Sequence, residues 1–517
     1  MKIAGPIVLA ILDGWGIAPP SRGNAVTLAR TPNLDHWRQT YPWTTLKASG
    51  RAVGLPDGQD GNSEAGHMNI GAGRIVPQED MQILSSISNG LFFRNSAFLA
   101  AIQHVKSHGR TLHLMGMLGT SESAHADPDH LLALLMLVQN AGLTKVKLHL
   151  FTDGRDSPRF AARDIITKFL PHLGDARVAT LMGRFFSMDR NKNWDRTAQA
   201  YRAIVSGQAT HRVPDVMTAV SQAYNRGESD EFVQPTVIAE YQGVADGDAI
   251  IFFNLRSDRA RQLTKAFVQP DFEQRNAATH PFRRTRVIDD LLFVAMTDFG
   301  PDLGNILTAF PAQLLTQTLP MVLQRHHQLY IAESEKYAHV TYFFNGGYAD
   351  PVGGEDRVMI PSSEEPFYDR VPTMCSRLLT NRVYQTIISH EHDFVVVNFA
   401  NTDMVAHTGN LRAGVAAMEC ADGCLGRIAE AVLGQQGGLL ITGDHGNLEE
   451  MINLATGEID TEHSAHPVPF HLVAEAAKKT SLRADGVLGD VAPTILALMG
   501  ERQPAEMTGT SLLGSHR

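Results

Sequence analysis

Three uninterrupted apolar runs, far apart in the sequence, constrain most strongly how this chain can fold. They span residues 7–12, 393–399 and 438–442, and each leads within a few residues to an acidic or imidazole side chain. Such runs, alternating with helical patterns such as 415–432, are typical of a parallel sheet covered by helices on both faces. Residues distant in sequence meet at the carboxyl ends of such strands. The pattern predicts one α/β sheet shared by both ends of the chain.

The middle of the chain has its own alternation of strands and helices. Apolar runs at 145–151, 177–182 and 249–253 each lead into a charged turn. A chain of 517 residues is also long enough for two domains. We therefore expect a second α/β domain, residues 77–310, inserted into a first domain made of residues 1–76 and 311–517. Proline and glycine near 75–77 and 301–304 mark the expected hinges.

The overall charge of the chain excludes some classes of partner. A formal net charge of -10 argues against nucleic-acid or anionic-membrane surfaces, so an anionic substrate must meet a local cluster of cations. The first apolar run is too short for a signal sequence or a membrane span. The three cysteines form no CxxC motif and cannot all pair. We expect a cytoplasmic protein with reduced thiols that acts as a monomer on a small molecule.

A serine in a glycine-flanked segment suggests a nucleophile. Ser63 lies between Gly61 and Gly66 in a stretch that looks ready to open a helix. A serine hydroxyl needs a neighbouring base or a metal ion to become reactive at neutral pH. Residues that could bind metal lie at or just behind the ends of strand-like runs: Asp13, Asp403, His407, Asp444, His445 and His463.

The spacing and chemistry of these residues suggest two metal sites. Asp403 and His407 are four apart, so one helical turn would point both side chains the same way. Mixed carboxylate and imidazole ligands suit manganese, zinc or iron, and two ions about 4 Å apart can clamp a phosphoryl group. Asp-Gly and Asp-His-Gly sequences are nevertheless more often simple turns. Spacing alone therefore leaves the metal sites open.

Read together, seven motifs resemble the cofactor-independent phosphoglycerate mutase family. They are LDGWG at 12–16, NSEAGH at 62–67, DGRD at 153–156, EKY at 335–337, FNGG at 344–347, NTDMVAH at 401–407 and GDHGN at 443–447. The resemblance implies an alkaline-phosphatase-like domain interrupted by a phosphotransferase domain. It implies interconversion of 2- and 3-phosphoglycerate in glycolysis through a phosphoserine, with two manganese or other divalent ions and without 2,3-bisphosphoglycerate.

The resemblance also implies roles for individual residues. It makes Asp403, His407 and His463 ligands of one ion, and Asp13, Ser63, Asp444 and His445 ligands of the other. Around the phosphoglycerate it places His125, Arg155, Asp156, Arg184, Arg190, Arg256, Arg259 and Lys336. Planar guanidinium groups suit a substrate that carries a phosphate close to a carboxylate. Asp156 is our hypothesis for proton transfer to the glycerate hydroxyls, although a carboxylate beside Arg155 would normally stay ionised.

Two positions depart from the family pattern. The family usually shows an Asp-Gly-Gly-Val-His-Ser-His run where this chain has Ser-Glu-Ser-Ala-His-Ala-Asp at 121–127, so only His125 carries over. His466 stands where the family commonly has asparagine; it is either a contact near the metal or a surface or outer histidine, and the second interpretation is favoured.

Other functions fit parts of the same pattern. A related two-metal phosphatase or a phosphopentomutase would share the metal sites but not the cationic inserted domain. A non-catalytic metal- or phosphate-binding protein would share both the metal sites and the cationic inserted domain. For a mutase, we expect the domains to close about their hinges, because a phosphoserine open to water would hydrolyse.

Overall fold

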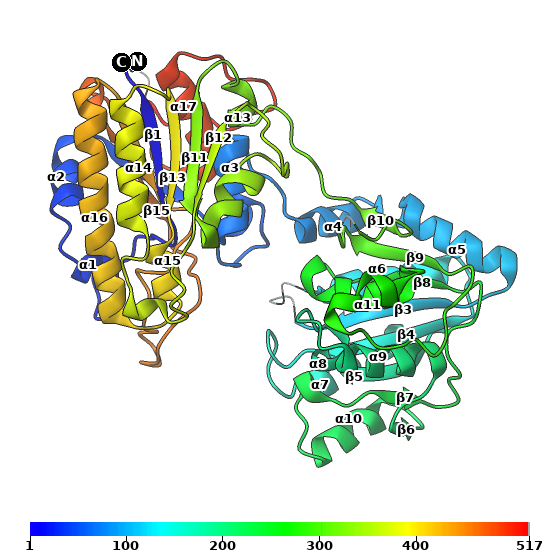
Figure 1. The fold of residues 1–517 in the computed structure, drawn as a ribbon. Helices are drawn as coiled ribbons and strands as arrows, with labels where there is room; N and C mark the ends of the chain where they lie inside the picture. Colours follow the sequence, from blue (N-terminus) through cyan, green and yellow to red (C-terminus); the bar gives the residue numbers. More distant parts are fainter. Residues whose placement is uncertain (121–122, 124, 301, 515–517) are drawn as a thin grey trace. The chain divides into compact units, whose positions relative to one another are not determined.

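The computed structural model describes all residues except 121, 122, 124, 301 and 515–517, and it contains two compact units. Unit 1 comprises Met1–Gln78 and Gln313–Arg517, and unit 2 comprises Glu79–Ala312. Unit 2 is therefore inserted into unit 1, to which both ends of the chain belong (Figure 1). Each unit is built on a largely parallel sheet with helices on its faces. The predicted α/β class, with a second α/β domain inserted in the first, is confirmed.

The sheet of unit 1 has eight strands within the described residues. From edge to edge they are β12 (Asp356–Ile360), β11 (Gln328–Glu333), β13 (Phe394–Phe399), β1 (Ile7–Leu12), β14 (Gly438–Thr442), β15 (Val468–Val473), β2 (Trp43–Lys47) and β16 (Gly486–Val487). The central strand β1 pairs in parallel with β13 and β14. The three apolar runs that the sequence places in one sheet are thus adjacent strands, and all their strand residues are buried.

Helices cover both faces of this sheet because its central strand is apolar on both sides. Val8, Ala10 and Leu12 pack with one set of helices, whereas Ile7, Leu9 and Ile11 pack with the other. The first set is α1 (Ala25–Leu28), α2 (Pro32–Thr40), α14 (Ser376–Ile388) and α16 (Leu411–Gly434). The second set is α3 (Ser63–Ala72), α13 (Leu319–Val322) and α17 (Val491–Met499). In Figure 1 the two sets lie on opposite sides of β1.

Unit 2 repeats the same plan with its own sheet. The strand order is β10 (Leu307–Phe310), β9 (Leu292–Thr297), β8 (Ala249–Phe252), β3 (Leu112–Leu118), β4 (Val146–Thr152), β5 (Arg177–Gly183), β7 (Thr236–Ile238) and β6 (His211–Val213). Only the β5–β7 pair is antiparallel among these described strands. The carboxyl ends of β8, β3, β4 and β5 consequently share one edge.

Two layers of helices enclose the sheet of unit 2. One contains α5 (Ser96–His108), α6 (Pro128–Asn140), α7 (Ala162–Phe169) and α10 (Val216–Asn225). The other contains α9 (Trp194–Ser206), α11 (Ser257–Val268) and α12 (Phe272–Arg275). The remaining helices are α4 (Glu79–Ser88) and α8 (Arg184–Ser187). Throughout the described chain, every helix is too short or too polar to cross a bilayer.

The expected hinge near 301–304 is wrong. Residues 302–304 lie inside unit 2, because the chain goes on to form β10, which pairs in parallel with β9. The chain passes back into unit 1 only at 312/313. Residues 302–304 belong to the connection between these two neighbouring strands instead.

Close packing of α3 gives a testable prediction about stability. A Cβ atom at Gly71 would lie 2.0 Å from the carbonyl oxygen of Phe344, so Gly71→Ala must push two backbones apart. We expect it to lower the free energy of unfolding by about 1–3 kcal/mol. Denaturation followed by tryptophan fluorescence measures this, because Trp15, Trp37 and Trp43 all belong to unit 1.

The matched control is Gly423→Ala in the long helix α16. A Cβ atom there meets nothing within 4 Å, so the better helix propensity of alanine should stabilise the protein by up to about 1 kcal/mol. Equal destabilisation by both substitutions would contradict the packing argument.

Candidate metal centre and active site

Acidic and imidazole side chains gather at the carboxyl edge of the unit 1 sheet. Asp13 directly follows β1, and Asp444 and His445 follow β14. Asp403 lies on α15 (Asn401–Ala406), the short helix after β13, and His407 follows that helix. His463 comes from the segment that leads to β15. The sheet thus brings together all six residues that the sequence singles out as metal ligands.

Three of these residues form one group around a carboxylate oxygen of Asp403. The Nε2 atoms of His407 and His463 lie 3.4 and 3.6 Å from Asp403 Oδ1, and 3.1 Å from each other. Asp403, His445 and His463 also offer ligand atoms within 4.8 Å of one another. Asp403 is buried.

Ser63 lies in the second group. Its Oγ is 3.0 Å from Asp13 Oδ1 and 3.0 Å from His445 Nε2. His445 Nε2 is in turn 3.4 Å from Asp13 Oδ1 and 3.6 Å from Asp444 Oδ2. The hydroxyl is therefore in contact with two of the three residues that the sequence groups with it.

The local sequence explains how Ser63 reaches this position. Asn62 caps α3 by accepting a hydrogen bond from the backbone N–H of Ala65, which makes Ser63 the first residue of the helix. Gly66 allows α3 to approach the metal-binding turn, since a Cβ there would lie 2.5 Å from the carbonyl oxygen of Asp444. The N-terminus of α3 therefore places the hydroxyl among the ligands.

Lys336 lies within this centre, among the candidate metal ligands. It ends the short helix η6 (Ser334–Lys336) that follows β11. Its Nζ lies 2.6 Å from Asp13 Oδ1, 2.7 Å from Ser63 Oγ and 2.7 Å from Asp403 Oδ2. The family resemblance places this lysine at the phosphoglycerate; its contacts here are with the Ser63 hydroxyl and two carboxylates.

The donor groups fit divalent metal ions. Asp13, Asp403 and Asp444 are buried carboxylates, and burial favours neutralisation unless positive charge is close. The ammonium group of Lys336 supplies one such charge. Asp444 Oδ2 is buried and lies 3.1 Å from His67 Nδ1, and a carboxylate oxygen with this one contact keeps a lone pair for a cation. Oxygen and imidazole donors without thiolate suit manganese or zinc.

The pKa values in this centre show how strong the negative field is. Burial raises the pKa of Asp13 and Asp403, but the charge of Lys336 and the neighbouring imidazoles together outweigh it, so both pKa values lie below the usual range. Burial lowers the pKa of His445, but the charge of Asp444, with Asp13 and Asp403, outweighs it and raises the pKa to about 10. The carboxylates therefore stay ionised and attract any available cation.

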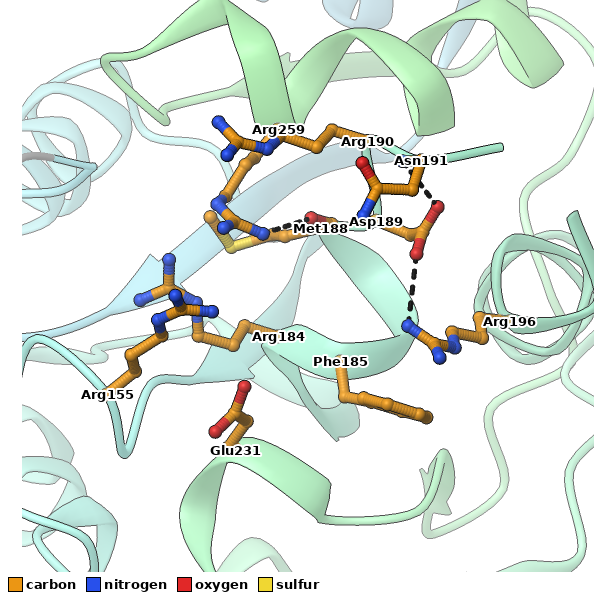
Figure 2. A pocket seen from close by; sticks show the side chains of 10 residues that line it. All are labelled: Arg155, Arg184, Phe185, Met188, Asp189, Arg190, Asn191, Arg196, Glu231 and Arg259. Atoms are coloured by element: carbon orange, nitrogen blue, oxygen red, sulfur yellow. Dashed lines mark hydrogen bonds and ion pairs between the residues drawn. The ribbon is translucent and has the colours of Figure 1, made fainter. Parts of the chain in front are cut away.

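A second cluster lies in unit 2, at the edge shared by the carboxyl ends of its parallel strands. A cavity of about 230 Å³ lies there, lined mainly by polar and charged side chains (Figure 2). The lining residues are Arg155, Arg184, Phe185, Met188, Asp189, Arg190, Asn191, Arg196, Glu231 and Arg259. Four arginines that the sequence predicts near a phosphorylated substrate thus face one cavity.

The other predicted residues of unit 2 lie beside this arginine cluster. Asp258 connects two of the arginines, because it lies 2.7 Å from Arg190 Nη1 and 4.0 Å from Arg256 Nε. His125 is buried, and burial together with the charge of Arg184 lowers its pKa to about 4. His125 and Arg256 are not among the residues that line the cavity.

Arg184 keeps the Asp156 carboxylate ionised, whereas the sequence suggested Arg155 for this role. Arg184 Nη1 donates to Asp156 Oδ2 at 2.8 Å and also bonds the buried carboxylate of Asp153. Burial raises the pKa of Asp156, but Arg184 outweighs it and lowers the pKa. The sequence neighbour Arg155 lines the cavity instead.

Several polar residues at the two sites were not predicted. Asn398 donates to Asp13 Oδ2 at 2.7 Å, and Asn447 donates to Asp403 Oδ1 at 2.7 Å. His67, one helical turn after Ser63, lies 3.1 Å from Asp444 Oδ2. Arg196 lines the arginine cavity. Two of these residues could have been found from the sequence, because Asn398 interrupts an apolar run and His67 is four residues from Ser63.

The two positions that depart from the family pattern have different outcomes. His466 Nε2 pairs with Glu450 Oε2 at 3.1 Å, and both side chains are more than a third exposed, which favours the surface interpretation. Within the divergent run 121–127, residues 121, 122 and 124 lie outside the described part of the chain.

Comparison with known proteins decides the family. A model of the Metalloenzyme superfamily matches residues 5–503. A 2,3-bisphosphoglycerate-independent phosphoglycerate mutase of Chloroflexus aggregans is 47% identical over 534 residues, with 98% of each chain covered. One from Methanosarcina barkeri, numbered 2, is 49% identical over 529 residues with the same coverage. The chain belongs to the 2,3-bisphosphoglycerate-independent phosphoglycerate mutases.

A solved structure agrees with this family membership. The phosphoglycerate mutase of Leishmania mexicana, crystallised at low cobalt concentration, matches with a TM-score of 0.74 at 27% identity. The match covers 100% of this chain and 98% of that one. As a member of this mutase family, the protein is an isomerase, and the superfamily and the donor groups together indicate that it uses divalent metal.

Proton release on metal binding gives a prediction for this phosphoglycerate mutase. The metal-free protein holds His445 protonated at pH 8, because the pKa of the imidazole is about 10. A metal ligand must be neutral, so an ion that binds His445 displaces its proton. Affinity for Mn²⁺ should therefore rise between about pH 6 and pH 10, and activity should fall as the pH drops.

Isothermal titration calorimetry with Mn²⁺ in two buffers of different ionisation enthalpy measures the released protons. His466→Asn is the control, because this surface imidazole should leave the number of released protons unchanged. Binding heats that are the same in both buffers would contradict the prediction.

Proposed function

We propose that this mutase interconverts 2-phosphoglycerate and 3-phosphoglycerate through a phosphoserine on Ser63, activated by two manganese ions. The position of Ser63 Oγ supports this most directly, since it lies 3.0 Å from Asp13 Oδ1, 3.0 Å from His445 Nε2 and 2.7 Å from Lys336 Nζ. The names of the relatives support the substrate and the independence from 2,3-bisphosphoglycerate. Other divalent ions fit the same donors.

The two ions have separate ligand sets in this proposal. Asp403, His407 and His463 hold one ion. Asp13, Ser63, Asp444 and His445 hold the other. The contacts within each group, at 3.0–3.6 Å between side-chain atoms, support the assignment.

The two units have different tasks. Unit 1 corresponds to the metal-binding phosphatase-like domain expected at 1–76 and 311–517, and unit 2 to the phosphotransferase domain expected at 77–310. This assignment is supported by where the side chains lie: the candidate metal ligands belong to unit 1 and the arginine cluster belongs to unit 2.

Residues of unit 1 prepare the hydroxyl for attack on phosphorus. Ions held by the two ligand sets would lower the pKa of the serine hydroxyl and offset the negative charge of the phosphoryl group. Ser63 is the first residue of α3, where the helix dipole favours negative charge on the attacking oxygen and on the phosphoryl group. Lys336 donates to the same oxygen at 2.7 Å and so holds it in place.

The cationic cluster of unit 2 distinguishes a mutase from a phosphatase. Its His125 and the guanidinium groups of Arg155, Arg184, Arg190, Arg256 and Arg259 bind phosphoglycerate, and Lys336 of unit 1 is the further cation that the family resemblance places at the substrate. Their charge retains the glycerate after its phosphoryl group has moved to Ser63, so the other hydroxyl can take the group back. Asp156 moves the proton to and from the two glycerate hydroxyls.

Ser63→Ala tests the phosphoserine. We expect the conversion of 3- to 2-phosphoglycerate, assayed with Mn²⁺ and without added 2,3-bisphosphoglycerate, to fall by at least about 10³-fold, because the nucleophile is lost. Intact mass spectrometry of the wild type with substrate should show one added phosphoryl group, which the variant lacks. Ser107→Ala, at an exposed serine of α5, is the control.

Two results would count against this function. Isomerisation by Ser63→Ala at the wild-type rate would exclude the phosphoserine. Release of inorganic phosphate by the wild type without formation of 2-phosphoglycerate would favour the related phosphatase.

Asp156→Asn tests the proton-transfer role. The amide keeps the size of the side chain but cannot accept a proton, so kcat should fall by about 10²-fold with little change in KM. Asp153→Asn is the matched control, because Asp153 is the other carboxylate on Arg184. It should change KM more than kcat. Unaltered turnover in Asp156→Asn would exclude the role.

A further inference from the structure

His67 joins the helix that carries the nucleophile to a metal-ligand carboxylate. The side chain is fully buried and lies one helical turn after Ser63. Its Nδ1 is 2.9 Å from the backbone carbonyl oxygen of Ser63. Its Nε2 is 3.0 Å from Asn398 Nδ2, and the same amide nitrogen donates to Asp13 Oδ2 at 2.7 Å. A continuous chain of hydrogen bonds thus leads from Ser63 to Asp13.

The chemistry of Asn398 and Asp13 assigns a direction to each hydrogen bond in this chain. Asn398 must turn its NH2 group toward Asp13, because its own oxygen would repel the carboxylate. The second hydrogen of that NH2 group points to His67 Nε2, which therefore accepts. His67 consequently carries its proton on Nδ1, and this proton is donated to the carbonyl oxygen of Ser63.

These directions decide between two roles for His67. By distance alone it could be a metal ligand, because Asp13, His67 and Asp444 offer ligand atoms within 4.8 Å of one another. Both ring nitrogens are already used, however, since Nδ1 bears the proton and the lone pair of Nε2 accepts from Asn398. Asp444 Oδ2 lies 3.1 Å from the same Nδ1, so the Nδ1 proton faces this carboxylate as well as the carbonyl oxygen of Ser63, and the remaining lone pairs of Oδ2 stay available to a cation.

We propose that His67 is a positioning residue that, through Asn398, holds Asp13 in register with the first turn of α3. This inference rests on the proposed roles of Ser63 and of the ion bound by Asp13, Ser63, Asp444 and His445. The ion on Asp403, His407 and His463 has its ligands on other elements. Loss of His67 should therefore weaken one ion site and leave the other intact.

Metal binding by the full-length protein tests the proposal. Mn²⁺ titration of the wild type, His67→Ala and Asn398→Ala, followed by calorimetry and by electron paramagnetic resonance of free Mn²⁺, resolves the two binding steps. In both variants one step should weaken by about 10- to 100-fold while the other keeps its wild-type affinity. The kcat should fall and the KM for phosphoglycerate should stay unchanged. Two unaltered binding steps in both variants would overturn the proposal.

Two further variants separate positioning from a general loss of structure. His67→Gln retains one donor and one acceptor, so it should bind Mn²⁺ more tightly than His67→Ala. Asn69→Ala removes another buried polar side chain of α3, which bonds the carbonyl oxygens of Val53 and Ala65. It should lower the unfolding temperature but leave both Mn²⁺ steps intact. Equal weakening of one step by Asn69→Ala would mean that His67 acts only through the stability of α3.

The same experiment distinguishes this inference from the proposed function. Isomerisation by the wild type without a phosphoserine would overturn the role of Ser63. The effect of His67 on Mn²⁺ affinity would still be read from the binding steps, which need no turnover.

Discussion

Three buried carboxylates at one edge of a sheet are the constraint on which the rest of the structure depends. Asp13, Asp403 and Asp444 are almost inaccessible to water, yet they stay ionised because Lys336 and neighbouring imidazoles face them. Burying such a concentration of charge is unfavourable unless cations balance it. The parallel strands β1, β13 and β14 impose it by ending side by side. The affinity for divalent ions follows from this field.

Unit 2 presents the opposite electrostatic problem. Its arginines repel one another, and carboxylates such as Asp153, Asp156 and Asp258 offset part of that repulsion while they orient the guanidinium groups. The cavity keeps a surplus of positive charge in a chain whose net charge is -10. The molecule thus separates a centre that attracts cations from one that attracts anions, which suits a phosphorylated substrate handled with metal ions.

Much of this arrangement could be predicted from the sequence because buried parallel strands leave a strong signal. The apolar runs that became β1, β13 and β14 predicted a shared sheet, and the acidic and imidazole residues behind them predicted where side chains converge. The prediction of a hinge near 301–304 is wrong, because a proline- and glycine-rich connection between neighbouring strands looks the same in sequence as a link between domains. The sequence also did not predict the pairing of Asp156 with Arg184, because a turn separates sequence neighbours and brings distant residues together.

The hydrogen bonds among His67, Asn398 and Asp13 needed the structure, because they depend on how α3 packs against the sheet. The sequence shows an asparagine within an apolar strand and a histidine four residues after the serine, but it does not show which residues they contact. Sequence patterns alone do not predict the polar residues that hold other polar residues of a site in place.

The ammonium group of Lys336 has a consequence for the life of the protein without its ions. It lies between Asp13 and Asp403 and supplies an internal counter-charge that no chelator can remove. Without its ions, two of the three buried carboxylates therefore keep a charged partner, which lowers the electrostatic cost of an empty centre.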